Sequence, residues 1–228
     1  HADDEARLLM VELTAAEQPQ ESTDEPAVRL ALVLDRSGSM SGAKLETTRK
    51  ATAKLIRSLK PEDRVAMVVY DNDVNVLTDL AAPNRQVANL VEEIFPGGTT
   101  NLYGGWVQGA ELVGSKGNVV LLSDGLANMG MFTDAENLQS QAYYAHTKNG
   151  VTTSTIGVGE DYDEALMAGM AKGGGGNHYF AENVDAIMEA FGQERFALGA
   201  IALEKVTLTW GKKQHDLRLL FGGEVKRL

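Results

Sequence analysis

Cysteine is absent from this chain of 228 residues. Its absence excludes disulfide bonds, thiolate metal sites and cysteine nucleophiles, but it leaves the cellular compartment open. The chain also lacks any apolar run near the roughly 20 residues that cross a bilayer, so we expect no membrane insertion. The printed sequence shows no signal peptide, which favours the cytoplasm, although a cleaved leader would leave the same sequence.

Basic residues are scarce relative to acidic ones. The chain has 21 Lys and Arg against 32 Asp and Glu, which gives a formal net charge of −11. Such a surface repels nucleic acid, which proteins bind mainly through Lys and Arg, so nucleic acid is excluded as a partner. The remaining composition, 43% hydrophobic and 23% charged, is typical of a globular protein long enough for one well-buried α/β domain.

Strand and helix patterns alternate along most of the chain. Val28–Leu34 and Asn118–Ser123 are almost continuously apolar, as expected for strands covered on both faces of a parallel sheet. We expect further strands at 64–70, 74–77, 151–158 and 178–180, and helices at 44–59, 84–95, 102–113, 163–172 and 184–196. Another helix should start at the capping box Thr133–Glu136 and end at Gly150. The pattern predicts an α/β fold, doubly wound and Rossmann-like, whose mostly parallel sheet carries helices on both faces and one short antiparallel edge strand.

The two ends of the chain depart from this alternation. Arg7–Thr14 alternates like a strand, and Ala202–Trp210 and His215–Phe221 resemble a hairpin across Gly211–Lys213. A two-stranded hairpin is marginal on its own, and domain termini often lie close together. We therefore expect a domain at residues 28–198, with flanking β segments at 1–27 and 199–228 that pair as a small β module.

Oxygen-bearing side chains follow two of the buried strands. The first strand runs into Asp35-Arg36-Ser37-Gly38-Ser39, and another ends at Ser123-Asp124-Gly125. Between them, Gly97–Asn101 places two threonine hydroxyls on a glycine-rich loop before a helix. Ligands of open α/β sheets bind beyond the carboxyl ends of the strands, and an all-oxygen donor set suits a hard cation such as Mg²⁺.

These segments resemble a known family. Residues 33–40 (VLDRSGSM), 97–102 (GGTTNL) and 122–125 (LSDG) resemble the metal-ion-dependent adhesion site of von Willebrand factor A domains, in their bacterial form. The resemblance assigns five metal-binding positions to Asp35, Ser37, Ser39, Thr100 and Asp124. It implies that the three hydroxyls bind the metal directly, the two aspartates act largely through water, and a partner carboxylate takes the open position. The ion is expected to be Mg²⁺, with Mn²⁺ or Ca²⁺ as alternatives, and Thr99 stays open as the ligand in place of Thr100.

The predicted function is therefore divalent-metal-dependent protein–protein binding, in adhesion or complex assembly, without catalysis. The alternative is a Mg²⁺-dependent hydrolase or phosphotransferase on a similar sheet. Such an enzyme needs a nucleophile or general base near the metal, and Ser37 stands where the dehalogenase type has a second Asp. Lys44 is the one Lys or His near the motif loops. The sequence names neither the partner nor the pathway.

Some weaker signals indicate local structure or a contact surface. Asp71-Asn72-Asp73 starts like a calcium loop, but Val76 and Ala82 replace its Gly and Glu, which predicts an exposed turn. The glycines at 173–176 predict a flexible cap and loop after a helix. Met129 and Met131 follow Asp124 and could form an adaptable contact surface.

Overall fold

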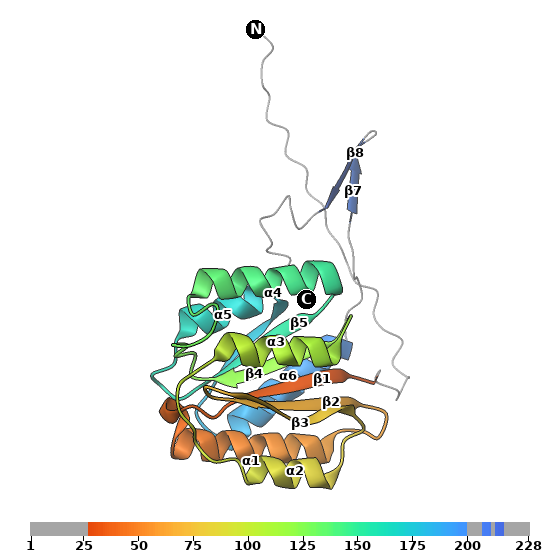
Figure 1. The fold of residues 1–228 in the computed structure, drawn as a ribbon. Helices are drawn as coiled ribbons and strands as arrows, with labels where there is room; N and C mark the ends of the chain where they lie inside the picture. Colours follow the sequence, from red (N-terminus) through yellow and green to blue (C-terminus); the bar gives the residue numbers. More distant parts are fainter. Residues whose placement is uncertain (1–26, 200–206, 211–212, 217–228) are drawn as a thin grey trace. The chain divides into compact units, whose positions relative to one another are not determined.

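The computed structural model describes residues 27–199, 207–210 and 213–216 (Figure 1). Pro26–Gly199 belong to one compact unit, and the remaining described residues belong to a second. The strand predicted at Arg7–Thr14 lies outside the described residues, so its pairing with the C-terminal hairpin stays a prediction.

A six-stranded sheet forms the centre of the larger unit. Its strands are β1 (Arg29–Asp35), β2 (Arg64–Tyr70), β3 (Val74–Ala81), β4 (Asn118–Ser123), β5 (Thr152–Val158) and β6 (Gly175–Ala181). They lie in the order β3-β2-β1-β4-β5-β6, and every neighbouring pair is parallel except β2 and β3. The predicted doubly wound sheet with one antiparallel edge strand is confirmed, although β3 extends four residues beyond the predicted Leu77.

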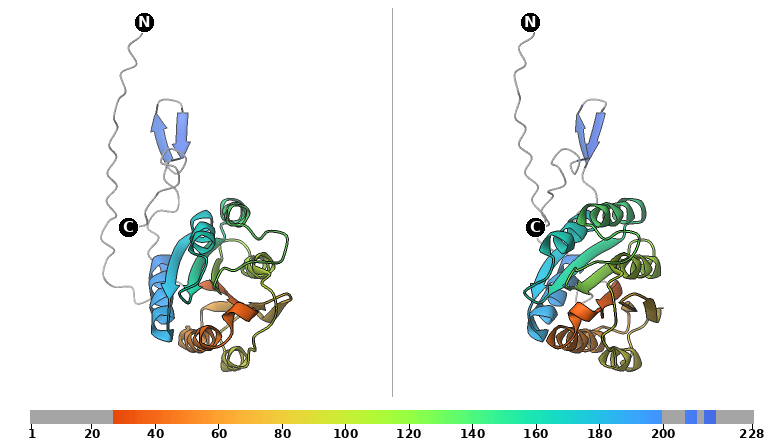
Figure 2. Two further views of the ribbon diagram at one scale, coloured as in Figure 1. Left: turned by 90° about the vertical axis from the view of Figure 1, so that its left-hand side faces the viewer. Right: turned by 60° about the vertical axis from the view of Figure 1, so that its left-hand side comes forward.

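Helices cover both faces of this sheet (Figures 1 and 2). They are α1 (Ala43–Ser58), α2 (Arg85–Glu92), α3 (Leu102–Val113), α4 (Ala135–Asn149), α5 (Glu164–Gly173) and α6 (Val184–Gly199), with a short 3₁₀ turn η1 (Gly38–Met40) after β1. The helices α1, α2 and α6 contribute to one buried cluster, and α3, α4 and α5 to the other. Among the described residues, no helix is long and apolar enough to span a bilayer.

The alternation of side chains along β1 explains how one strand serves both layers. Leu32 belongs to the cluster under α1, whereas its neighbour Val33 belongs to the cluster under α3, and both are 0% exposed. On the second face, Trp106 is 3% exposed, and its Nε1 donates to Thr153 Oγ1 at 3.0 Å. A buried indole N–H needs such a partner, so this contact fixes α3 against the sheet.

The helix α4 begins one residue later than the capping box suggests. Asp134 is the N-cap, and its carboxylate accepts from the backbone N–H of Asn137 at 2.9 Å. The predicted cap Thr133 is therefore wrong, because the aspartate at the next position supplies a stronger acceptor for the first turn. The predicted end at Gly150 is confirmed, with this glycine in the left-handed conformation at φ 68°.

The four glycines at 173–176 do not form the predicted flexible loop. They cross from the end of α5 into β6, and β6 starts at Gly175 rather than at the predicted His178. A Cβ on Gly173 would lie 2.3 Å from the carbonyl oxygen of Gln139, and one on Gly176 would lie 2.1 Å from that of Thr153. The glycines are therefore explained by close backbone packing.

The smaller unit shows one antiparallel pair, β7 (Thr207–Trp210) and β8 (Lys213–Asp216). Trp210 pairs with Lys213, which confirms a hairpin at the predicted turn. The second strand starts at Lys213 instead of the predicted His215.

Candidate metal site

The candidate site lies where the strand order reverses. From β1 the sheet continues to β2 on one side and to β4 on the other, so the ends of β1 and β4 lie at the point where open α/β sheets bind ligands. These ends lie at the left of the ribbon in Figure 1 and face the viewer in the left panel of Figure 2. Asp35 is the last residue of β1, and Asp124 directly follows β4.

Asp35 is fully buried at the end of β1. Its Oδ1 accepts from the backbone N–H of Ser37 at 2.8 Å, and its Oδ2 accepts from the hydroxyl of Ser123 at 2.5 Å. Burial raises the pKa of Asp35 to about 6 against the opposing effect of these hydrogen bonds, and nearby Asp124 adds to the rise. A cation beside this carboxylate would favour its charged form.

The first loop after β1 brings two hydroxyls together. Ser37 Oγ and Ser39 Oγ lie 3.2 Å apart, and the 3₁₀ turn η1 between Ser37 and Ser41 sets this spacing. Ser37 is buried, whereas Ser39 is exposed. The hydroxyls thus extend from the interior to the surface beside the ends of the strands.

The threonine loop is hydrogen-bonded to the segments on both sides of it. The backbone N–H of Gly97 donates to the carbonyl of Arg36 at 2.7 Å, and the N–H of Gly38 donates to the carbonyl of Gly98 at 2.8 Å. Thr100 also accepts backbone bonds from Asn128 and Met129, each at 3.2 Å. Three segments far apart in the sequence therefore form one connected surface.

The two threonines of this loop differ in environment. Thr100 is 2% exposed, and its backbone N–H donates to Asn128 Oδ1 at 2.9 Å. Thr99 is exposed, and its hydroxyl lies 3.1 Å from the sulfur of Met129. This difference favours Thr100 as the residue that belongs to the site.

Asp71 supports the threonine loop from β2, although the sequence predicted an exposed turn here. It is 4% exposed, its Oδ2 lies 3.1 Å from Arg36 Nη2, and its carbonyl accepts from Asn101 N at 2.8 Å. A Cβ on Gly97 would lie 1.7 Å from the same Oδ2. The prediction is therefore wrong at Asp71, because the residue neutralises Arg36 and packs against the glycine loop.

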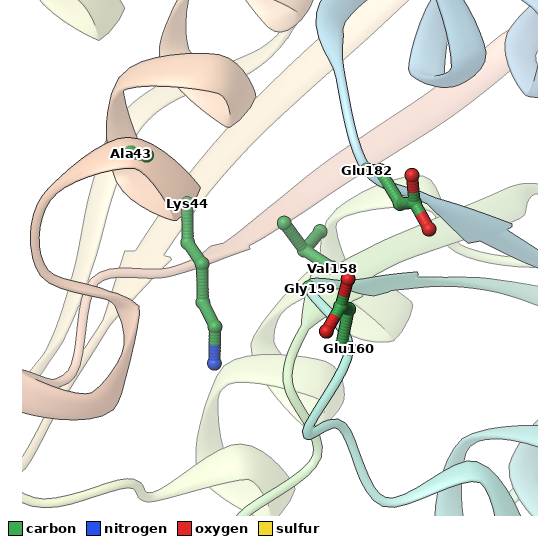
Figure 3. Close-up of a pocket in the computed structure, with 6 residues that line it drawn as sticks. All are labelled: Ala43, Lys44, Val158, Gly159, Glu160 and Glu182. Atoms are coloured by element: carbon green, nitrogen blue, oxygen red, sulfur yellow. The ribbon is translucent and has the colours of Figure 1, made fainter.

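Asp124 is fully buried and pairs with a residue from α1. Lys44 Nζ lies 3.2 Å from Asp124 Oδ2. The Lys44 side chain also lines a cavity of about 210 Å³ together with Val158, Gly159, Glu160 and Glu182 (Figure 3). This contact could not be predicted from the sequence, because Lys44 and Asp124 are 80 positions apart.

The donor set at this crevice fits a hard cation. Two buried carboxylates, Asp35 and Asp124, accompany the hydroxyls of Ser37, Ser39 and Thr100, and all the donors are oxygen. Within the described residues, no group of three or more His, Cys, Asp or Glu side chains is placed to hold a metal. A set of two carboxylates and three hydroxyls is compatible with that finding.

Comparisons with known proteins agree on one family. Residues 30–193 match the family described as von Willebrand factor type A domain. The uncharacterized protein YfbK of Escherichia coli (strain K12) is 29% identical over 202 residues, which cover 82% of this chain and 33% of YfbK. This chain therefore spans about a third of the length of that relative.

Solved structures show the same fold at lower identity. BatB from Bacteroides thetaiotaomicron superimposes with a TM-score of 0.64 at 19% identity, over 75% of this chain and 98% of that one. The vWF domain of the type V pili tip protein Mfa5 from Porphyromonas gingivalis gives 0.60 at 16% identity, over 80% and 98% of the two chains. These likenesses concern the fold.

Proposed function

The chain belongs to the von Willebrand factor type A domain family, and we propose that it binds a protein partner through one divalent metal ion. The ion is held beyond the ends of β1 and β4 by Asp35, Ser37, Ser39, Thr100 and Asp124. Domains of this family are generally interaction modules, which supports binding over catalysis.

The observation that carries this proposal is the pair of aspartates at the ends of β1 and β4. Asp35 and Asp124 are both 0% exposed, and burying ionised carboxylates is costly unless a cation or hydrogen bonds compensate. Despite its hydrogen bonds, Asp35 has a pKa raised to about 6, so a nearby cation would stabilise its ionised carboxylate. The hydroxyls of Ser37 and Ser39 lie on the adjoining loop, where they complete an all-oxygen set.

When bound, the ion supplies a positive centre with an open position for a carboxylate from the partner. This chain's own residues provide the surface around that position. Leu126, Met129 and Met131 follow Asp124 and are 42%, 42% and 76% exposed. Exposed apolar side chains beside a charged site favour contact with a protein surface over a free small anion.

Calorimetry with Mg²⁺ and Mn²⁺ tests the metal assignment. We expect Asp35→Ala to abolish measurable binding and to leave the circular dichroism spectrum unchanged, because Asp35 is the last residue of β1 and follows the apolar part of the strand that packs in the core. Asp79→Ala is the matched control, since it removes the same charge from an exposed position of β3. Unchanged binding in Asp35→Ala would sink the metal assignment.

A second experiment addresses the partner. The wild-type protein and Asp35→Ala are immobilised in parallel, and proteins from the native organism are captured in Mg²⁺ and released with EDTA. We expect a partner on the wild-type resin alone. A partner that stays bound in EDTA would refute metal-dependent binding. In a separate phosphatase screen, Mg²⁺-dependent turnover would support the alternative hydrolase function.

A further inference from the structure

We propose that Lys44 sets the charge of the metal site, so that the site holds its ion weakly by itself and keeps an excess of positive charge for the partner's carboxylate. This inference rests on the proposed function. It concerns a residue outside the five positions that the family resemblance assigns.

The first observation is the contact between Lys44 and Asp124. Lys44 Nζ lies 3.2 Å from Asp124 Oδ2, and the carboxylate is fully buried while the lysine side chain is 23% exposed. Charges in such a shielded place interact more strongly than on the surface, and salt screens them less. The ammonium therefore neutralises one of the two carboxylates of the site.

The second observation is that the fold accommodates the lysine stem. Gly159 follows β5 with φ +85°, and a Cβ at this position would lie 2.5 Å from Lys44 Cε and 3.1 Å from Lys44 Cδ. The stem thus lies directly against a backbone position that is open only because it is glycine. This close packing directs the ammonium toward Asp124.

Other charged groups near Lys44 do not replace it. Arg36 lies on the same loop as the serines, but its guanidinium is 3.1 Å from Asp71 and forms its own ion pair. Glu160 and Glu182 line the far side of the cavity beside Lys44 and add no positive charge (Figure 3). Among the described residues, Lys44 is therefore the cation that pairs with Asp124.

Charge counting gives the consequence. Asp35 and Asp124 contribute −2 and Lys44 contributes +1, so these three side chains sum to −1. A divalent ion then leaves the loaded site at +1, whereas without Lys44 the sum would be zero. A net positive site attracts a carboxylate more strongly, and the same ammonium repels the metal ion and lowers its affinity.

The test compares the affinities of lysine variants for Mn²⁺ and Mg²⁺ by calorimetry at pH 8. Lys44→Met keeps most of the stem and removes the charge, and we expect it to bind both ions about tenfold or more tightly than the wild type. Lys44→Arg keeps the charge and should stay within about threefold of the wild type. Lys54→Met removes a lysine from the same helix at an exposed position, 3.9 Å from Asp185, and should leave the affinity unchanged.

The possible results separate this inference from the proposed function. Unchanged or weaker binding in Lys44→Met overturns the role of Lys44, while binding that Asp35→Ala abolishes still supports the metal site. Failure of the wild type to bind either ion overturns both. If Lys44→Met does not fold, Lys44→Gln takes its place, because glutamine is uncharged but retains a hydrogen-bond donor for Asp124. Failure of both variants to fold at any Mg²⁺ concentration also overturns the inference.

Discussion

Ser123 joins the two central strand ends, and its hydroxyl can be removed without changing the backbone. The side chain is 0% exposed, donates to Asp35 Oδ2 at 2.5 Å and accepts from Gly125 N at 2.8 Å. In Ser123→Ala, Asp35 Oδ2 and Gly125 N each lose a hydrogen bond that is buried in the protein. At pH 7.5, which is above the Asp35 pKa of about 6, this carboxylate is charged. The hydrogen bond from Ser123 to Asp35 is therefore a bond to a charged acceptor.

The magnitude follows from these two bonds. A hydrogen bond to a charged group contributes about 1.5–3 kcal/mol, and a neutral one contributes about 1 kcal/mol. We therefore expect Ser123→Ala to lower the free energy of unfolding by about 2.5–4 kcal/mol, which is a large share of the roughly 5–15 kcal/mol of a typical domain. Urea denaturation in EDTA, followed by circular dichroism, measures this difference as a shift in midpoint at constant slope.

Ser58→Ala is the matched control for this change. Ser58 is exposed at the end of α1, and its hydroxyl donates to the carbonyl of Leu55 at 2.8 Å. We expect a loss of at most about 0.5 kcal/mol there, because water replaces the lost bond. If Ser123→Ala is no more destabilised than Ser58→Ala, the contact with Asp35 does not stabilise the ends of β1 and β4.

Two further predictions concern the threonine loop and the opposite end of the strands, where Asp63 precedes β2. In calorimetry, Thr100→Ala should weaken Mg²⁺ binding by about tenfold or more, and Thr99→Ala should weaken it by less. The reason is that Thr100 is buried, whereas the Thr99 hydroxyl contacts the sulfur of Met129. Equal or reversed effects would contradict the choice of Thr100 over Thr99. Asp63 is buried, and although burial raises its pKa, hydrogen bonds from Val28 N, Arg195 and Lys60 N outweigh this and lower the pKa below 3.8. A lowered folded pKa stabilises the protein above the unfolded pKa and loses this contribution as the pH falls through the folded value. Asp63→Asn should therefore have a free energy of unfolding about 1.5–3 kcal/mol below that of the wild type at pH 7. Urea titrations should show this difference becoming smaller below about pH 4. A difference that does not change with pH would refute the assigned cause.

Some elements could be predicted to the residue, and the strands predicted at 28–34 and 151–158 differ by one residue from β1 (Arg29–Asp35) and β5 (Thr152–Val158). The predictions for Arg64–Tyr70, Asn118–Ser123 and Leu102–Val113 match β2, β4 and α3. β2 and β4 are almost continuously apolar because helices cover both faces, so their ends coincide with a change in composition. The edge strands β3 and β6 carry partly exposed residues and glycines, so composition does not mark their ends.

The five candidate metal residues could be proposed from the sequence, and their role stays a prediction. Asp35, Ser37 and Ser39 share one loop, and the family resemblance added Thr100 and Asp124. The supporting contacts of Ser123, Lys44 and Asp71 could not be predicted, because each depends on a bond across the fold. Ser123 and Asp35 are 88 positions apart, and Lys44 and Asp124 are 80 apart.

The strand order also determines when during folding this site can exist. β1 pairs with β2 through the short connection of α1, but it meets β4 only after a much longer chain segment has closed. Until that pairing forms, Asp35 lies apart from Ser123, and Lys44 lies apart from Asp124. The proposed ion would therefore bind the folded domain and not partly folded chains, so its binding would shift the folding equilibrium without supplying an early nucleus.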